Sequence, residues 1–234
     1  MGIHEGHRQR LRDRFLKEGL DHFEEKHVLE LLLFYCIPRK DTAEIAYNLL
    51  KHFGSLAQVL DASPEELREV SGVGDGVATF LPLFNAVGRY YRVHRSKPAS
   101  VLRTVEDCGD FLVPYFHGRK NETVFILCLD AKCKVLACKE VGEGIVNSAS
   151  ISTRRIVEMA LGAGASSVVL AHNHPSGVAL PSADDILTTR QVALGLAAVD
   201  IVLTDHLIIA DDDYVSLTQS GFYNYEEASS VLNG

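Results

Sequence analysis

Hydrophobic residues recur at helical spacing through the first part of this chain. From Leu11 to Leu33 they follow three- and four-residue intervals, with no sustained strand-like alternation. Proline, serine and acidic residues mark helix ends, and Ser63-Pro64-Glu65-Glu66 has the spacing of a capping box. The pattern predicts four helices. The first ends before Pro38, the second runs from Asp41 to Leu50, the third begins at Pro64 and the fourth runs from Val77 to Tyr91.

The hydrophobic pattern changes after residue 100, where short apolar runs alternate with helical segments. Thr123–Leu129 is a compact run of strand-forming residues, and Asp130-Ala131-Lys132 is typical of a turn before a returning strand. The pattern predicts strands at residues 123–129, 135–139, 167–170, 201–203 and 207–210, and helices at residues 154–161 and 183–196. These elements favour a sheet with helices packed on it.

A polar segment that contains Pro98 separates the two patterns. We therefore expect a helical domain over residues 1–97 and a mixed-sheet domain over residues 101–234, which together make an α+β protein. The chain has 234 residues, of which 47% are hydrophobic and 23% charged, and this excludes wholesale disorder. Residues 1–100 carry 14 basic and 14 acidic side chains, whereas residues 101–234 carry 9 and 17. The net charge of −8 argues against a uniformly basic nucleic-acid binder.

The cysteines and the apolar runs indicate where the protein resides. The chain has 5 cysteines, an odd number, without a C-x-x-C pair, so we interpret them as small residues in a reducing compartment. No run approaches the ~20 apolar residues that span a bilayer, and the first residues lack the apolar core of a signal peptide. The sequence thus favours a cytoplasmic protein without a membrane partner.

A histidine pair at the end of a predicted strand offers metal-binding chemistry. His172 and His174 are two residues apart, so in extended backbone both imidazoles point to one side. Neutral imidazole is a preferred zinc ligand, and three protein ligands leave one position open in catalytic sites. Asp185, in the first turn of the next predicted helix, fits the third position. Ser182-x-x-Asp185 also has the spacing of a capping box, and Asp184 is an adjacent competitor.

The same residues resemble a known family. The metal motif of JAMM (MPN+) metallohydrolases is reproduced here: His172-x-His174 is followed after seven residues by Ser182, and after two more by Asp185. The surrounding Ala171-His172-Asn173-His174-Pro175-Ser176-Gly177 is similar to the RadC branch. Further similar segments are Thr204-Asp205-His206-Leu207-Ile208-Ile209, Tyr214-Val215-Ser216, Leu31-Leu32-Leu33-Phe34 and Phe53-Gly54-Ser55-Leu56. The resemblance implies an MPN-type domain, akin to the cytidine deaminase fold, behind a helical N-terminal domain.

The resemblance also implies roles for individual residues. His172, His174 and Asp185 match the zinc ligands, and Ser182 matches the motif serine that helps to stabilise an oxyanion. The motif demands a glutamate upstream that acts as general base, and Glu122 is the best match, with Glu143 and Glu158 as rivals. The chain departs from RadC proteins at Ser152-Thr153-Arg154-Arg155, where they usually carry His-Pro-Arg-Glu.

A glycine-rich segment in the first part resembles a helix-hairpin-helix. Gly72-Val73-Gly74 would let backbone N–H groups approach a DNA phosphate at the start of a helix. Such a contact is independent of the DNA sequence, because phosphates carry no base information. Asp75 follows where DNA-binding hairpins often carry Lys or Arg, and a purely structural helix pair is the alternative. The arginines at positions 8, 10, 12 and 14 could assist binding or simply be solvated.

These observations lead to one expected function and two alternatives. We expect a zinc-dependent hydrolase of the JAMM class that acts on a peptide or isopeptide bond of a peptide or protein substrate. A metal-dependent DNA nuclease is one alternative, in which the helical domain delivers DNA to the metal. A non-catalytic DNA-binding protein with a structural metal is the other. The family label links RadC proteins to DNA repair, although the sequence itself shows no repair chemistry.

Overall fold

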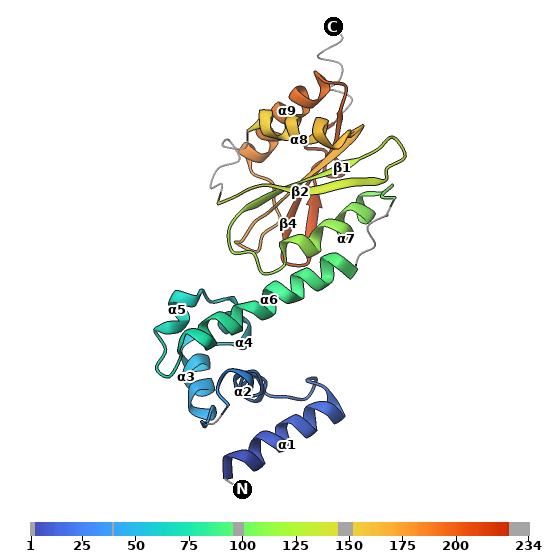
Figure 1. Ribbon diagram of the computed structural model, residues 1–234. Coiled ribbons are helices and arrows are strands. Elements are labelled where there is room, and N and C mark those ends of the chain that lie inside the picture. The colour runs from blue at the N-terminus through green and yellow to red at the C-terminus, as the bar shows by residue number, and fades with distance from the viewer. Residues whose placement is uncertain (1–2, 39, 96–100, 145–151, 225–234) are drawn as a thin grey trace. The chain divides into compact units, whose positions relative to one another are not determined.

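The computed structural model describes residues 3–38, 40–95, 101–144 and 152–224. The chain divides into two compact units, Met1–Gly88 and Arg89–Gly234 (Figure 1). The division lies inside one long helix, α6 (Asp75–Arg95). The predicted boundary between residues 97 and 101 falls on residues 96–100, outside the described residues.

The first unit is helical, as the periodicity predicts. Its core consists of side chains that are fully or almost fully buried, among them Leu29, Leu33, Leu49, Leu67 and Leu81. Ser63 accepts a hydrogen bond from Glu66 N while the Glu66 carboxylate accepts one from Ser63 N, which confirms the predicted capping box. The helices before α6 are α1 (Ile3–Glu18), α2 (Glu25–Cys36), α3 (Ala43–Phe53), α4 (Leu56–Asp61) and α5 (Pro64–Arg68).

The second unit contains a five-stranded mixed sheet with strand order β2-β1-β3-β4-β5, in which only the β3–β4 pair is parallel. The strands are β1 (Thr123–Leu129), β2 (Val135–Glu143), β3 (Ser167–Asn173), β4 (Val202–Ala210) and β5 (Asp213–Ser216). The helices after α6 are α7 (Val105–Phe116), α8 (Thr153–Ala163) and α9 (Ala183–Ala197). The expected α+β class, a helical part followed by a mixed sheet with helices, is confirmed.

Alternating side chains of the strands build a core on each face of the sheet. In β1, Val124 and Ile126 pack with α8 and α9, whereas Phe125 and Leu127 pack with α7 on the other face. Figure 1 shows α8 and α9 on one side of the sheet and α7 on the other. Every residue of β1 is buried, as expected for a strand covered on both faces.

One prediction about the strands needs correction. The predicted strands at residues 201–203 and 207–210 are one continuous strand, β4, so the predicted interruption was wrong. The polar residues Asp205 and His206 stay buried within it because they find partners: Asp205 accepts hydrogen bonds from Ser216 Oγ and Thr218 N. Helix α7 and strand β5 were not predicted.

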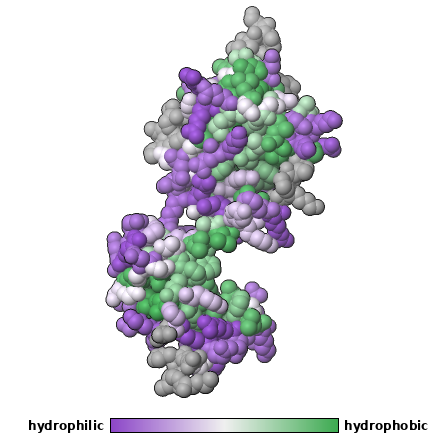
Figure 2. Space-filling view, viewed as in Figure 1, coloured by the Kyte–Doolittle hydropathy of each residue, from purple (hydrophilic) through white to green (hydrophobic). Residues whose placement is uncertain are grey.

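Hydrophobic and hydrophilic areas lie side by side on the visible face of each unit (Figure 2). Among the described residues, no helix is long and apolar enough to cross a membrane. None of the five cysteines takes part in a disulfide, and Cys108 and Cys128 are buried. Burial raises the pKa of Cys128 to about 11, so this thiol stays protonated at neutral pH.

Candidate metal centre

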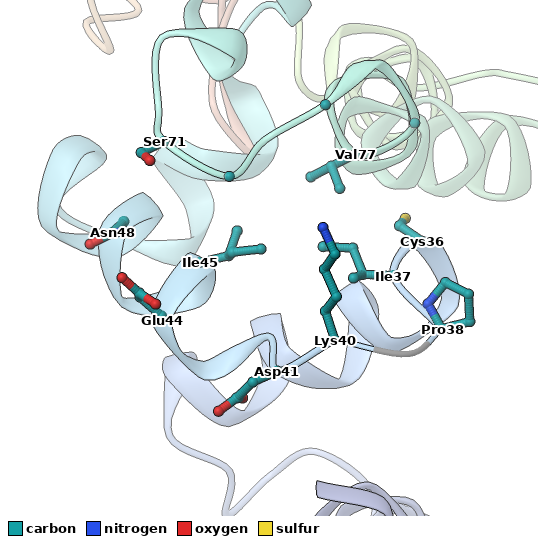
Figure 3. A pocket seen from close by; sticks show the side chains of 13 residues that line it. Cys36, Ile37, Pro38, Lys40, Asp41, Glu44, Ile45, Asn48, Ser71 and Val77 are labelled. Atoms are coloured by element: carbon teal, nitrogen blue, oxygen red, sulfur yellow. The ribbon is translucent and has the colours of Figure 1, made fainter.

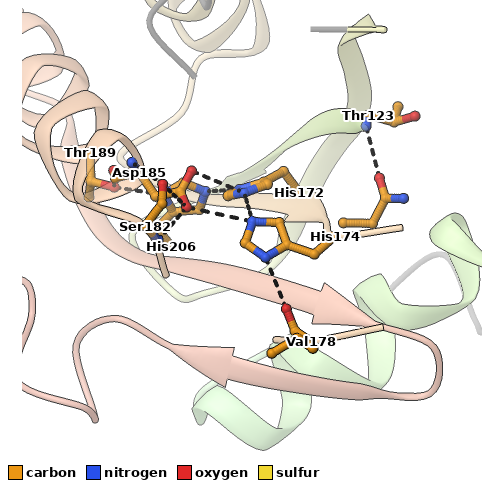
Figure 4. Close-up of polar contacts among 9 residues, drawn as sticks. Thr123, His172, His174, Val178, Ser182, Asp185, Thr189 and His206 are labelled. Atoms are coloured by element: carbon orange, nitrogen blue, oxygen red, sulfur yellow. Dashed lines mark hydrogen bonds and ion pairs between the residues drawn. The ribbon is translucent and has the colours of Figure 1, made fainter. Parts of the chain in front are cut away.

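The histidine pair lies where β3 leaves the sheet. His172 pairs with Val124 of β1 on one side and with Ile208 of β4 on the other, and the residue is buried at 5% exposure. His174 follows the last residue of the strand, and its backbone N–H donates to the Ile209 carbonyl at 2.8 Å. The strand ladder therefore fixes the positions from which both imidazoles project. In Figure 4 the side chains of His172, His174 and Asp185 point toward one another.

Helix α9 brings the carboxylate to the pair. Ser182 caps this helix: its Oγ accepts from Asp185 N at 3.1 Å, and Asp185 Oδ2 accepts from Ser182 N at 2.7 Å. Asp185 Oδ1 takes no part in the cap and lies 3.2 Å from His172 Nε2. Asp185 is therefore a capping residue and a neighbour of the histidines at once. The adjacent Asp184 is exposed.

The three side chains have the spacing of metal ligands. His172 Nε2 is 3.0 Å from His174 Nε2, and His174 Nε2 is 3.5 Å from Asp185 Oδ2. Ligand atoms on a tetrahedral zinc, with bonds of about 2.0–2.1 Å, lie about 3.3 Å apart. Among the described residues, this is the group of His, Cys, Asp and Glu side chains that could hold a metal ion.

The hydrogen bonds of His174 also suit a metal ligand. Its Nδ1 lies 3.0 Å from the Val178 carbonyl, which can only accept, so Nδ1 carries the proton. Nε2 then presents its lone pair toward the carboxylate and the other imidazole. Two nitrogens and one anionic oxygen that face each other fit a divalent cation such as zinc.

The electrostatics of the site follow from this convergence. The hydrogen bond with Asp185 raises the pKa of His174 although burial opposes the shift, and the Glu122 charge adds to it. Burial alone would raise the pKa of Asp185, but its interactions with the neighbouring His172, His174 and Ser182 outweigh burial and hold this pKa far below its ordinary value. The carboxylate is thus anionic at any physiological pH, as a metal ligand must be.

Glu122 lies directly before β1, half-buried, with its carbonyl bonded to Gly144 N at 2.8 Å. Its charge acts on His174, yet it does not belong to the group of converging ligand atoms among the described residues. The two rival glutamates are exposed and paired elsewhere. Glu143 accepts from Asn121 Nδ2 at 3.2 Å, and Glu158 accepts from Arg154 at 2.8 Å on the surface of α8.

Sequence reasoning missed the residue between the two histidines. Asn173 Oδ1 accepts from Thr123 N at 2.8 Å, and its Nδ2 donates to the Asn121 carbonyl at 3.2 Å. The Asn173 side chain thereby holds the residues on both sides of Glu122. The position inside the histidine motif was visible, but this contact depends on the pairing of β1 with β3.

Sequence reasoning also missed the layer behind His172. His206 of β4 is completely buried, and its Nε2 lies 2.8 Å from His172 Nδ1. Its Nδ1 lies 2.6 Å from Thr189 Oγ1 of α9. Burial lowers the pKa of His206 well below its ordinary value, and the nearby His172 lowers it further. His206 is thus a neutral imidazole.

The glycine hairpin of the first unit lies far from any of these residues in sequence. Gly72 has φ of +90°, and a Cβ there would come within 2.9 Å of the Ile45 side chain, so this position requires glycine. Gly74 precedes α6 and has open space around it. The hairpin borders a pocket of about 770 Å³ that is also lined by Lys40 and Asp41 (Figure 3).

Several charged residues of the first unit are engaged within the protein. Arg68 Nε donates to Asp75 Oδ1 at 2.8 Å, so the acidic residue after the second glycine is paired with a cation. Arg8 donates to the carbonyls of Ile37 at 2.6 Å and Pro38 at 3.1 Å and thereby binds the end of α2. Arg14 donates to the His22 carbonyl at 2.7 Å. At least two of the four alternating arginines therefore have structural partners.

Comparisons with known proteins match almost the whole chain. A family model described as RadC-like JAB domain matches residues 102–222, and one described as UPF0758 N-terminal matches residues 5–79. A UPF0758 protein of Fusobacterium nucleatum is 35% identical over 224 residues, 93% of this chain and 97% of the relative. A UPF0758 protein of Ruegeria pomeroyi is 37% identical over 221 residues, 92% and 96% of the two chains.

Proposed function

The chain belongs to the RadC-like JAB domain family, and from this premise we propose that it is a zinc-dependent hydrolase that cleaves a peptide or isopeptide bond. The observation that carries the proposal is the convergence of His172, His174 and Asp185, whose ligand atoms all lie within 4.8 Å of one another. Their spacing and hydrogen bonds are those expected of ligands around a cation. They fit less well to the alternative, in which the buried side chains only form hydrogen bonds with one another. The family match agrees with the expected resemblance to RadC proteins.

The metal would be held by the two imidazole Nε2 atoms and the Asp185 carboxylate. Bound there, zinc would act as a Lewis acid toward a carbonyl oxygen and lower the pKa of water. Three protein ligands leave room for one more, which is the arrangement of catalytic rather than structural zinc sites. Structural zinc sites usually have four protein ligands, so three ligands argue against a purely structural metal.

Glu122 would serve as general base and then as general acid. Its carboxylate takes a proton from the water whose oxygen attacks the carbonyl carbon, and delivers it to the nitrogen as the C–N bond breaks. A carboxylate close enough to act on His174, but outside the ligand group, suits this role. The pairing of Glu143 and Glu158 with other side chains favours Glu122 over these rivals.

Ser182 would help to stabilise the oxyanion that forms during the attack. Its hydroxyl donates to Asp185 Oδ2 at 2.6 Å in the structure. For the proposed role, the hydroxyl must turn from Asp185 to the substrate oxygen when substrate is bound. The exposure of Ser182 leaves space for that turn.

The first unit would bind DNA through backbone phosphates at Gly72, Val73 and Gly74. The observation that favours this second proposal is the pairing of Asp75 with Arg68, which offsets the carboxylate next to the phosphate position. Such binding carries no base information and weakens steeply with salt. The same domain would deliver DNA to the metal if the protein were a nuclease.

The experiment that tests the hydrolase uses the full chain, purified without a metal-affinity tag and supplied with zinc or magnesium. It is incubated with a quenched library of peptides and isopeptides and with labelled single- and double-stranded DNA. We expect cleavage of a subset of the peptides with zinc and no cleavage of DNA. Cleavage of DNA alone would establish the nuclease, and zinc binding without any cleavage would establish a non-catalytic role.

Glu122→Gln tests the proposed base on whichever peptide is cleaved. The variant keeps the shape and a hydrogen bond but cannot accept the proton, so we expect wild-type folding and zinc content with turnover lowered by roughly 10²–10⁴-fold. Glu143→Gln and Glu158→Gln are matched controls and should retain most of the activity. A fast Glu122→Gln enzyme would transfer the base to a rival, and loss of zinc would make Glu122 a ligand.

A further inference from the structure

A chain of three buried hydrogen bonds lies behind His172, and the proposed reaction does not use it. His172 Nδ1 is 2.8 Å from His206 Nε2, and His206 Nδ1 is 2.6 Å from Thr189 Oγ1. Thr189 Oγ1 in turn is 2.6 Å from the carbonyl of Asp185. His206 and Thr189 are both 0% exposed, so water does not interrupt the chain. Figure 4 draws Thr189 and His206 together with His172 and Asp185.

The last acceptor fixes the direction of every bond in this chain. A carbonyl oxygen only accepts, so the single hydroxyl hydrogen of Thr189 points to Asp185 O. Thr189 Oγ1 must then accept from His206 Nδ1–H. A completely buried imidazole without a carboxylate partner stays neutral, so His206 Nε2 has no hydrogen and must accept from His172 Nδ1–H.

These hydrogen-bond directions determine the state of His172 Nε2, the nitrogen that would face the metal. With its proton on Nδ1, His172 has a lone pair on Nε2, the atom that lies 3.2 Å from Asp185 Oδ1. We propose that Thr189 and His206 are positioning residues that hold His172 in its metal-binding tautomer. This inference deepens the proposed function and rests on the metal centre described there.

The chain also ties the ring to the carboxylate that shares its metal. Thr189 bonds the carbonyl of Asp185 itself, four residues earlier in α9, so the helix turn that carries one ligand anchors the ring of another. His174 reaches the same tautomer by a shorter route, through the Val178 carbonyl at 3.0 Å. The hydrogen bonds of both imidazoles thus lead to a backbone carbonyl, directly for His174 and through His206 and Thr189 for His172. A carbonyl can only accept, so it fixes which ring nitrogen carries the proton.

The direct test is the tautomer of His172 in the metal-free full chain. Long-range ¹H–¹⁵N correlation spectra at mildly alkaline pH distinguish a ring with the proton on Nδ1 from one with the proton on Nε2. We expect His172 with the proton on Nδ1 and His206 likewise. A His172 ring with its proton on Nε2 would overturn the inference, whatever the metal affinity.

Variants separate positioning from simple packing. Thr189→Val keeps the shape but removes the hydroxyl, and His206→Leu removes the acceptor, so zinc affinity should fall by about 10- to 100-fold, as when an outer-shell partner is lost. His206→Gln can accept from His172 and donate to Thr189, and should restore most of the affinity. Thr188→Val, at a buried neighbouring threonine outside the chain, is the matched control and should bind zinc like the wild type.

The outcomes for the inference and for the proposed function differ. Unchanged zinc affinity in folded Thr189→Val and His206→Leu would overturn the positioning role while the metal centre stands. A wild-type protein with the expected His172 tautomer that takes up no zinc would overturn the metal centre and leave the hydrogen-bond chain supported.

Discussion

Two serines of this chain cap helices in the same way, and only one of them faces the candidate metal centre. Ser63 and Ser182 each accept from the backbone N–H three residues later, at 3.2 and 3.1 Å. Each also donates its own N–H to the side-chain carboxylate of that residue, at 2.7 Å in both cases. The difference is that the second carboxylate belongs to Asp185. One carboxylate therefore serves the helix cap with Oδ2, which also lies 3.5 Å from His174 Nε2, and faces His172 with Oδ1.

This pair of caps offers a comparison within one protein. Ser182→Ala and Ser63→Ala should each lower the free energy of unfolding by about 1 kcal/mol, since each removes an N-cap side chain. Only Ser182→Ala should also weaken zinc binding, because its hydroxyl holds Asp185 in place at 2.6 Å. Thermal denaturation and zinc titration measure the two effects. Equal zinc affinity in both variants would show that the Ser182 hydroxyl is not needed to hold Asp185 at the metal centre.

The sequence predicts the ligands of the site better than the residues that support them. His172, His174 and Asp185 are recognisable because their spacing and their places at a strand end and a helix start are local features. The contacts of Asn173 with Thr123 N and of His206 with His172 are not local. They depend on the β1–β3 and β3–β4 pairings, between residues 50 and 34 positions apart in sequence.

At the scale of elements, α7 shows why some of the fold was not predicted. Gly109 and Pro114 lie inside this helix and lower its helix propensity, so the sequence pattern gave no clear signal. Tertiary contacts compensate: Phe111, Leu112 and Phe116 are buried against the sheet. Thr104 also makes a complete capping box with Asp107 at its start. Strand β4 was predicted as two pieces for a related reason, because its polar residues also need partners that are distant in sequence.

The packing of α7 on the sheet leads to a prediction about Gly109. A Cβ at this position would overlap the ring of Tyr214 in β5, so Gly109→Ala should lower the free energy of unfolding by about 1–3 kcal/mol. Gly162→Ala in α8 is the matched control, because a Cβ there meets no heavy atom within 4 Å. It should raise stability by about 0.5–1 kcal/mol through better helix propensity. Chemical denaturation of both variants measures this difference. Similar stability changes of the same sign would contradict the close α7–β5 contact.

At the scale of the whole molecule, each unit has its own core. The sheet, both of its hydrophobic clusters and the candidate ligands lie in the second unit, whereas the hairpin lies in the first. The charge follows the same division, since residues 101–234 account for the whole excess of −8. This separation fits the two proposed activities, DNA binding by the first unit and hydrolysis of a peptide or isopeptide bond by the second.

A fragment of residues 101–234 should therefore fold alone and retain zinc binding, because its core is complete. A fragment of residues 89–234 should be more stable, since Arg89 Nη1 donates to the His117 carbonyl at 3.1 Å. DNA affinity should remain with residues 1–100 and fall steeply with salt. Circular dichroism and salt-dependent DNA titration of the fragments test this. DNA binding by 101–234 alone would contradict the assignment.

Zinc titration of the full chain, purified without a metal-affinity tag, tests the account most directly. We expect one zinc per chain. Asp185→Asn should bind it more than about 100-fold more weakly, beyond the usual loss for an outer-shell partner, because it removes the anionic ligand oxygen. Asp184→Asn, at the exposed neighbour, should bind zinc like the wild type. A wild-type protein that takes up no zinc, or an Asp185→Asn variant that binds it as tightly as the wild type, would contradict the account.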